Sequence, residues 1–123
     1  MAYQIIVSDD LDYVAIKHVG EVTYRELEEA RTRVKNILLE KSLCKIFVDV
    51  SEMIPVLEKA EKICFIGSHG DVYPSDVRIS VVVSAHLYET DRFVDELADL
   101  LDINQKLFVD KNEALAWLNP GNK

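Results

Sequence analysis

Short strand-like runs alternate with helix-periodic segments along the chain, and this alternation restricts the possible folds most. Residues 45–50 (KIFVDV) and 77–84 (VRISVVVS) are apolar runs of strand length. Between them, apolar residues recur at helical spacing from Val56 to Gly67. Nearly continuous apolar runs are typical of parallel strands that helices cover. The pattern therefore predicts an α/β protein.

The complete order of predicted elements is β-β-α-β-α-β-α-β-α. We expect strands at 3–7, 13–19, 45–50, 77–84 and 106–109, and helices at 24–41, from 56 to a break at 70–75, from about 90, and after a cap at 110–113. Consecutive right-handed crossovers then give a mainly parallel five-stranded sheet with an antiparallel first edge strand. We expect a single domain over residues 1–119 and a frayed tail at 120–123.

Crossovers of one hand place their helices on one face of the sheet. The other face would then expose alternate strand residues such as Phe47, Val82, and Val14 or Ala15. An exposed apolar surface of this kind favours dimerisation or an apolar ligand.

Four segments carry a resemblance to a known family: residues 13–23 (YVAIKHVGEVT), 45–51 (KIFVDVS), 77–84 (VRISVVVS) and 113–118 (EALAWL). The chain resembles the STAS/SpoIIAA-like superfamily, and in particular uncharacterised bacterial SpoIIAA-like proteins related to STAS and SEC14-type domains. The resemblance implies a small SpoIIAA-like fold led by an antiparallel strand.

The same resemblance draws attention to a segment that departs from the family. In STAS proteins that antagonise anti-sigma factors, a D-[LF]-S strand end precedes an Asp-Ser-Ser-Gly-like helix start, where a serine is phosphorylated. Residues 49–51 (DVS) match the first part, but residues 53–58 (MIPVLE) contain no hydroxyl side chain. Ser51 lies too early, so we do not expect this phosphorylation switch.

Charge and composition exclude several classes of protein. The chain has 14 Lys and Arg against 22 Asp and Glu, a net charge of −8, which disfavours binding to nucleic acids or anionic membranes. No apolar run approaches the ~20 residues that span a bilayer, so we expect no membrane insertion. Cys44 and Cys64 have apolar neighbours and no disulfide or metal spacing, so we expect buried thiols and a cytoplasmic location.

Polar residues follow the carboxyl ends of the predicted parallel strands, where open α/β sheets bind ligands. This candidate binding rim comprises Ser51, Glu52, Ser84, His86 and Asp110. A serine beside His86 with an acid behind it would suit hydrolysis. Because no G-x-S-x-G elbow is present and Ser and Asp favour helix N-caps, we prefer a capping role.

Residues 91–102 carry five acids and one base, a net charge of −4. The acids are Asp91, Asp95, Glu96, Asp99 and Asp102. They form either a solvated helix face or an acidic docking surface for a basic partner.

Cofactor and metal motifs are missing from the sequence. His18, His69 and His86 lack metal-ligand spacing, and we expect His69 to contact the end of a helix. No glycine-rich phosphate loop occurs. The best basic stretch, Arg31, Arg33 and Lys35, is predicted on a solvated helix face, so we expect no nucleic-acid partner. Because the metal and phosphate motifs are missing, we also expect no metal and no cofactor.

Three functions stay open at this point. The first is a non-enzymatic STAS-like regulatory or protein-interaction module that contacts a protein partner or a second copy of itself. The alternative is a SEC14-like binder of a small apolar ligand, held between the sheet and a movable helix at 56–68. The second alternative is a hydrolase that pairs Ser84 or Ser51 with His86.

Overall fold

Five strands form one sheet in the computed structural model, which describes residues 3–7, 12–54 and 56–119. The strands are β1 (Tyr3–Ile6), β2 (Val14–Glu21), β3 (Lys45–Ile54), β4 (Arg78–Val82) and β5 (Gln105–Phe108). Their spatial order is β1-β2-β3-β4-β5, with β1 antiparallel to β2 and the other pairs parallel. The predicted α/β fold class with an antiparallel edge strand is confirmed. The predicted tail at 120–123 lies outside the described residues.

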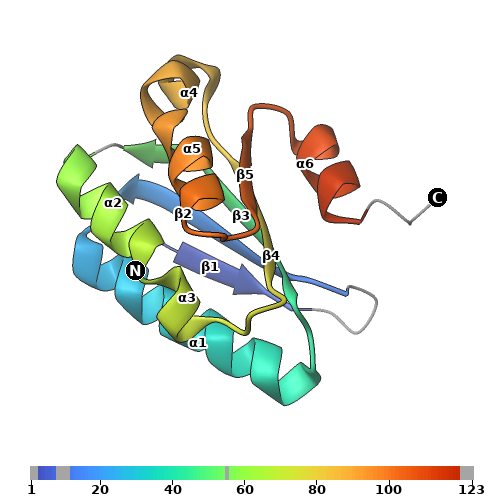
Figure 1. The fold of residues 1–123 in the computed structure, drawn as a ribbon. Helices are drawn as coiled ribbons and strands as arrows, with labels where there is room; N and C mark the ends of the chain where they lie inside the picture. Colours follow the sequence, from blue (N-terminus) through green and yellow to red (C-terminus); the bar gives the residue numbers. More distant parts are fainter. Residues whose placement is uncertain (1–2, 8–11, 55, 120–123) are drawn as a thin grey trace.

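The helices occupy the connections between strands and the C-terminal segment (Figure 1). They are α1 (Tyr24–Lys41), α2 (Lys59–Gly67), α3 (His69–Val72), α4 (Ala85–Asp91), α5 (Phe93–Leu100) and α6 (Lys111–Leu118). The predicted bounds of α1 are confirmed. Its start is fixed by a capping box, in which the Thr23 hydroxyl accepts from the Glu26 amide and the Glu26 carboxylate accepts from the Thr23 amide.

Two predicted helix boundaries are wrong. The helix after β3 begins at Lys59 rather than Val56, because Glu58 forms a capping box with Glu61. Gly70 does not break the helical region but lies inside α3. The helix expected from about residue 90 is α5, which begins at Phe93, and it is preceded by an unpredicted short helix, α4, whose start the Ser84 hydroxyl caps by accepting from the Leu87 amide.

The helices α1, α2 and α5 lie on one face of the sheet and α6 on the other (Figure 1). The prediction of a bare second face is therefore wrong. Phe47 and Val82 are each only 5% exposed, because Ala114 and Leu118 of α6 pack against them. Ala15 packs against this cluster, which also includes the side chains of Tyr13, Phe108 and Leu115. Among the described residues, α6 follows the last strand, β5, and packs back across the sheet.

The first face holds the larger part of the core. Val14 does not face α6 but packs with Ala30, Val34 and Leu38 of α1. The prediction of two buried thiols is wrong for Cys64, which is exposed on α2, whereas Cys44 is half-buried. Cys64 lies on the outer side of its helix, while Ile66 faces the core.

Candidate ligand pocket

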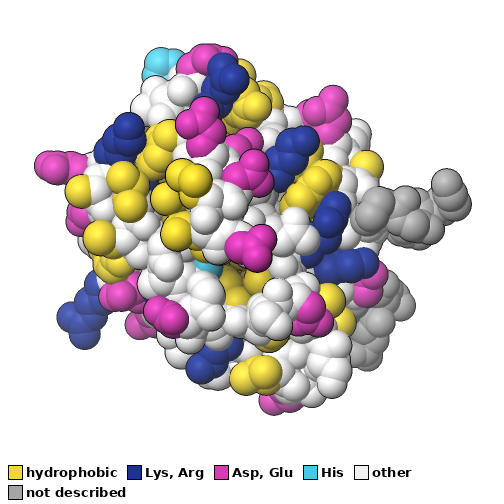
Figure 2. All heavy atoms as spheres, viewed as in Figure 1, with side chains coloured by type: hydrophobic (Ala, Val, Ile, Leu, Met, Phe, Trp, Pro, Cys, Tyr) yellow, Lys and Arg dark blue, Asp and Glu magenta, His cyan; other side chains and the backbone are white. Residues whose placement is uncertain are grey.

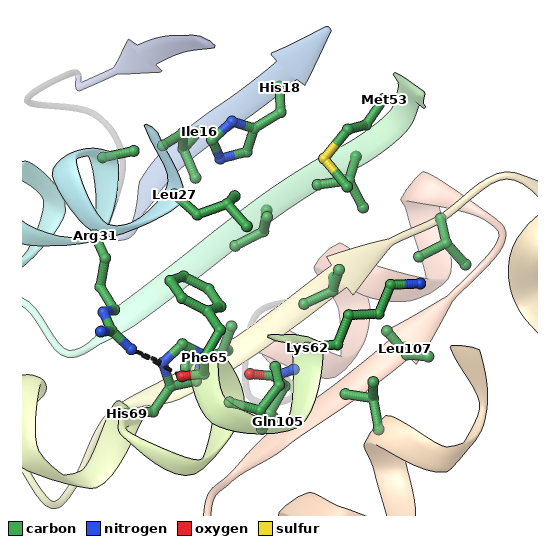
Figure 3. Close-up of a pocket in the computed structure, with 18 of the residues that line it drawn as sticks. Ile16, His18, Leu27, Arg31, Met53, Lys62, Phe65, His69, Gln105 and Leu107 are labelled. Carbon is green, nitrogen blue, oxygen red and sulfur yellow. Dashed lines mark hydrogen bonds between the residues drawn. The ribbon is translucent and has the colours of Figure 1, made fainter. Parts of the chain in front are cut away.

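A pocket of about 140 Å³ lies between the first face of the sheet and the helices that cover it. Its floor is one row of apolar side chains that runs across four strands in register: Ile16, Val48, Val81 and Leu107. Figure 2 shows a hollow near the centre of this face, with hydrophobic and histidine side chains visible inside it. Figure 3 shows the lining side chains converging from the strands and from α1 and α2.

Alternation along each parallel strand explains why this row is apolar. Residues two apart in a strand point to the same face. Val50 therefore lines the pocket beside Val48 in β3, and Val83, the residue after β4, lines it beside Val81. Val48, Val50 and Val81 remain partly exposed although they belong to central strands. The helices therefore leave part of this apolar surface open to the pocket.

Arg31 is the principal charged group of the pocket wall. Its side chain is almost fully buried, with 7% exposure, and the prediction of a solvated residue is wrong. Its Nη1 donates to the Phe65 carbonyl oxygen at 2.8 Å and to the Ser68 hydroxyl at 2.7 Å, and lies 3.1 Å from His69 Nδ1. The guanidinium carbon also lies 4.4 Å from the centroid of the Phe65 ring. Arg31 thus connects α1 to the end of α2 and the start of α3.

His69 lies beside Arg31 and lines the pocket. Burial, assisted by the charge of Arg31, lowers the pKa of His69 to about 3. The imidazole is therefore neutral, and its Nδ1 accepts the hydrogen bond from Arg31 (Figure 3). The centroid of the Tyr73 ring lies 5.3 Å from that of the imidazole, with the two rings tilted by 52°, and burial raises the pKa of the Tyr73 phenol. His69 was expected near the end of a helix in a loop but is a buried residue of α3.

Two further polar side chains of the pocket wall each have a buried atom without a hydrogen-bond partner among the described residues. His18 is 3% exposed and Gln105 is 8% exposed, and both line the pocket. His18 Nδ1 and Gln105 Oε1 have no hydrogen-bond partner within residues 3–7, 12–54 and 56–119. Burial lowers the pKa of His18, so this imidazole is neutral as well. Such atoms are unusual in protein interiors and indicate a site for a polar group.

An ion pair between Lys62 of α2 and Asp91 of α4 contributes to the same wall. Lys62 Nζ lies 2.7 Å from Asp91 Oδ1, and the two side chains are 18% and 15% exposed. Asp91 therefore does not belong to a free acidic surface, because it is turned toward the pocket and neutralised by Lys62.

The predicted acidic surface is smaller than expected. The carboxylate of Asp95 is partly buried, accepts from the Leu107 amide at 2.9 Å, and has its pKa raised by burial. Glu96, Asp99 and Asp102 are exposed. These three acids, together with the exposed Leu100 and Leu101, are called the α5 patch below.

The predicted rim residues do not line the pocket. The Ser51 amide and hydroxyl both donate to Asp49 Oδ1, and Glu52 pairs with Lys17 at 2.6 Å. Ser84 caps α4, and the Asp110 carboxylate caps α6 by accepting from the Glu113 amide. His86 is exposed on α4. In the part of the chain that the structure describes, no hydrogen bond joins His86 to Ser84 or Ser51, so the structure offers the hydrolase hypothesis no assembled pair.

The pocket residues give little signal in the sequence. Arg31 occupies a helix with eight other charged side chains, and Gln105 begins β5 without belonging to any motif. Within the described ranges, no cluster of three His, Cys, Asp or Glu side chains is arranged to hold a metal ion. No described helix combines the length and apolar character that a membrane crossing requires.

Neither a protein-family model nor a curated protein matches this sequence. Solved structures do match it over nearly its whole length. An uncharacterised protein of the DUF3478 family from Shewanella loihica, described as having a SpoIIAA-like fold, is 24% identical over 95% of this chain and 92% of its own, with a TM-score of 0.59. The anti-sigma factor antagonist SpoIIAA in its unphosphorylated form is 12% identical over 98% of this chain and 100% of its own, with a TM-score of 0.62. The chain has the SpoIIAA-like fold.

A further match with the SpoIIAA-like fold is an anti-sigma factor antagonist from Mycobacterium paratuberculosis. It is 13% identical over 95% of this chain and 94% of its own, with a TM-score of 0.63. The expected resemblance to STAS/SpoIIAA-like proteins is thus confirmed for the fold.

Proposed function

We propose that this SpoIIAA-like chain is a non-enzymatic binding module that acts in the cytoplasm and holds a small apolar molecule in the pocket between its sheet and helices. The observation that carries the proposal is the register row Ile16, Val48, Val81 and Leu107 under a pocket of about 140 Å³. An apolar surface left open inside a core gains free energy when an apolar group covers it, by about 25 cal/mol per Å².

The volume sets the size of the ligand. Apolar cavities of roughly 150 Å³ accept a benzene-sized molecule. A pocket of about 140 Å³ therefore suits a ring or aliphatic chain of about six carbons. Hexan-1-ol is a suitable neutral probe.

Titration with hexan-1-ol tests the proposal, with the methyl resonances of Val48 and Val81 recorded by NMR. We expect saturable shifts of these methyl groups. Val81→Met should fill the pocket and weaken binding at least about tenfold, because the added side-chain volume occupies the ligand's space. Val109→Met is the matched control, since Val109 is 45% exposed and lies outside the lining.

Two outcomes would count against the proposal. One is the absence of any saturable shift, and the other is an equal response of Val81→Met and the wild type. Native mass spectrometry of protein purified from cells gives an independent reading, because a co-purifying molecule adds a defined mass.

A second candidate function, regulation through contact with a protein, is supported by a different surface. Leu100 is 84% exposed in the α5 patch, beside the acidic Asp99. Two proteins of the same fold are anti-sigma factor antagonists. Because residues 53–58 lack a hydroxyl side chain, this candidate does not involve a phosphoserine at that segment.

A photo-crosslinking residue at position 100 tests the second candidate in cells. We expect a discrete crosslinked product that is lost when Asp99 and Asp102 are changed to Lys, since the patch would attract a basic partner. The same residue at the exposed Asn36 of α1 is the control. Light scattering separates contact with a second copy from contact with another protein. An identical product from both positions would contradict the α5 patch as the contact surface.

A further inference from the structure

The pocket wall carries one positive charge that no described acidic group balances. Lys62 and Asp91 neutralise one another at 2.7 Å. His18 and His69 are neutral, because burial lowers the pKa of both imidazoles. Arg31 remains, and it forms no ion pair with a carboxylate of residues 3–7, 12–54 or 56–119. This uncompensated cation lies inside a chain whose net charge is −8.

A buried guanidinium without a counter-ion is unfavourable. Among the described residues, its Nη1 contacts only neutral acceptors, namely a carbonyl oxygen, a hydroxyl and a neutral imidazole. Hydrogen bonds to neutral groups restore only part of the hydration that the ion loses on burial. An anion bound in the pocket would supply the negative charge that pairs with the Arg31 guanidinium.

The guanidinium also retains free donors. Nε and Nη2 of Arg31 donate to no group within the described part of the chain. The planar donor arrangement of arginine matches the two oxygens of a carboxylate. His18 Nδ1, which has no partner in the described residues, can also donate at the pocket wall when it carries the imidazole proton, whereas Gln105 Oε1 is an acceptor and gives no bond to a carboxylate.

We propose that the pocket binds a monoanionic amphiphile, a carboxylate with an aliphatic tail of about six carbons, and that Arg31 holds its carboxylate. This inference rests on the proposed binding of a small apolar molecule and adds the charge of its polar end. The apolar register row receives the tail. One uncompensated positive charge matches a carboxylate better than a doubly charged phosphate.

Three probes of equal chain length test the charge preference: hexanoate, hexan-1-ol and hexylammonium at pH 7.5. We expect hexanoate to bind on the order of tenfold more tightly than hexan-1-ol, because charge-assisted hydrogen bonds are stronger than neutral ones. Hexylammonium should bind most weakly. Dissociation constants come from the Val48 and Val81 methyl shifts, and intermolecular Overhauser effects should connect the C2 protons of hexanoate to the His69 ring.

Arg31→Gln should remove the preference for hexanoate while hexan-1-ol still binds. Arg33→Gln is the matched control, since Arg33 lies on the same helix but is exposed. If Arg31→Gln does not fold, the order of the three dissociation constants on the wild-type protein still tests the preference for an anion.

The possible failures are distinguishable. If hexan-1-ol binds and hexanoate binds equally or more weakly, the charge assignment is overturned and the proposed function stands. If none of the three probes binds, both are overturned. A hexanoate preference that persists in Arg31→Gln would overturn the role of Arg31.

Discussion

Arg78, the first residue of β4, contacts Trp117 in the last turn of α6. The guanidinium carbon of Arg78 lies 3.8 Å from the centroid of a Trp117 ring, while its Nε and Nη2 donate to the Trp117 carbonyl oxygen at 3.0 and 2.6 Å. The contact attaches the last turn of α6 to the start of β4. Because α6 covers Phe47 and Val82, Arg78 helps to hold the helix that closes this face.

Arg78→Lys should lower the free energy of unfolding by about 1 kcal/mol, since lysine cannot both stack on the ring and donate twice to one carbonyl. Urea denaturation followed by the fluorescence of Trp117 measures the change. Arg25→Lys, on the exposed face of α1, should have no effect. An equal loss in both variants would contradict the role of the contact.

Removing one charge of the Lys62–Asp91 ion pair should lower the free energy of unfolding more than removing both charges. Either Lys62→Met or Asp91→Asn leaves a charge that is shielded from water, and we expect each to lose about 1–3 kcal/mol of stability. The double variant should recover part of this loss, with a coupling energy of about 1 kcal/mol. A double-mutant cycle in urea gives the value. Simple additivity would show that the pair contributes no coupling.

Neutral His69 makes stability depend on pH. Unfolded His69 binds a proton near its ordinary pKa of 6.5, whereas the folded residue does so only near a pKa of about 3. The unfolded state therefore binds more protons between these values, and the free energy of unfolding falls as pH drops through them. Between pH 7 and pH 4, the titration of His69 should lower the free energy of unfolding by about 3 kcal/mol.

His69→Gln provides the comparison for this pH effect. The variant lacks the titrating imidazole, so its stability should decrease less between pH 7 and pH 4 than that of the wild type. The shifts of His18 and Asp95 are present in both proteins and cancel to first order. Parallel stability curves, measured by urea denaturation at each pH, would contradict a buried neutral His69.

Asp95 and Asp99 of α5 should respond differently to substitution. Asp95→Ala removes the acceptor for the Leu107 amide, and we expect a loss of about 1–2 kcal/mol. Asp99→Ala changes an exposed side chain and should stay within about 0.5 kcal/mol of the wild type. Thermal denaturation of the two variants compares them directly. Equal effects would mean that the hydrogen bond to β5 adds nothing to stability.

The sequence predicts the sheet well because its central strands, β3 and β4, contain dense apolar runs. Residues 45–50 and 77–84 could form little else between amphipathic helices. The position of α6 was not predictable in the same way. Crossover handedness applies to helices that lie between two parallel strands, whereas α6 follows β5, the last strand of the described residues. Its apolar residues fit either face, and only the packing of Leu118 against Phe47 and Val82 decides between them.

The pocket was harder to predict than the fold, because its polar residues do not follow their usual pattern of exposure. Arg31 falls among charged neighbours on α1, and periodicity alone assigns it to solvent. Its burial results from acceptors that come from α2, α3 and the residue between them, far along the chain. Local capping roles were predictable for Ser84 and Asp110, since a side chain and its amide partner lie within three residues.

The two edge strands of the sheet are short. β1 and β5 contain four residues each, whereas β3 contains ten. An edge strand exposes unpaired backbone groups that can recruit a strand from another molecule, and a short edge offers few of them. Copies of this protein therefore have little backbone with which to extend the sheet from one molecule to the next. We therefore expect weak edge-to-edge association, and little fibrillar aggregation, through either border of the sheet.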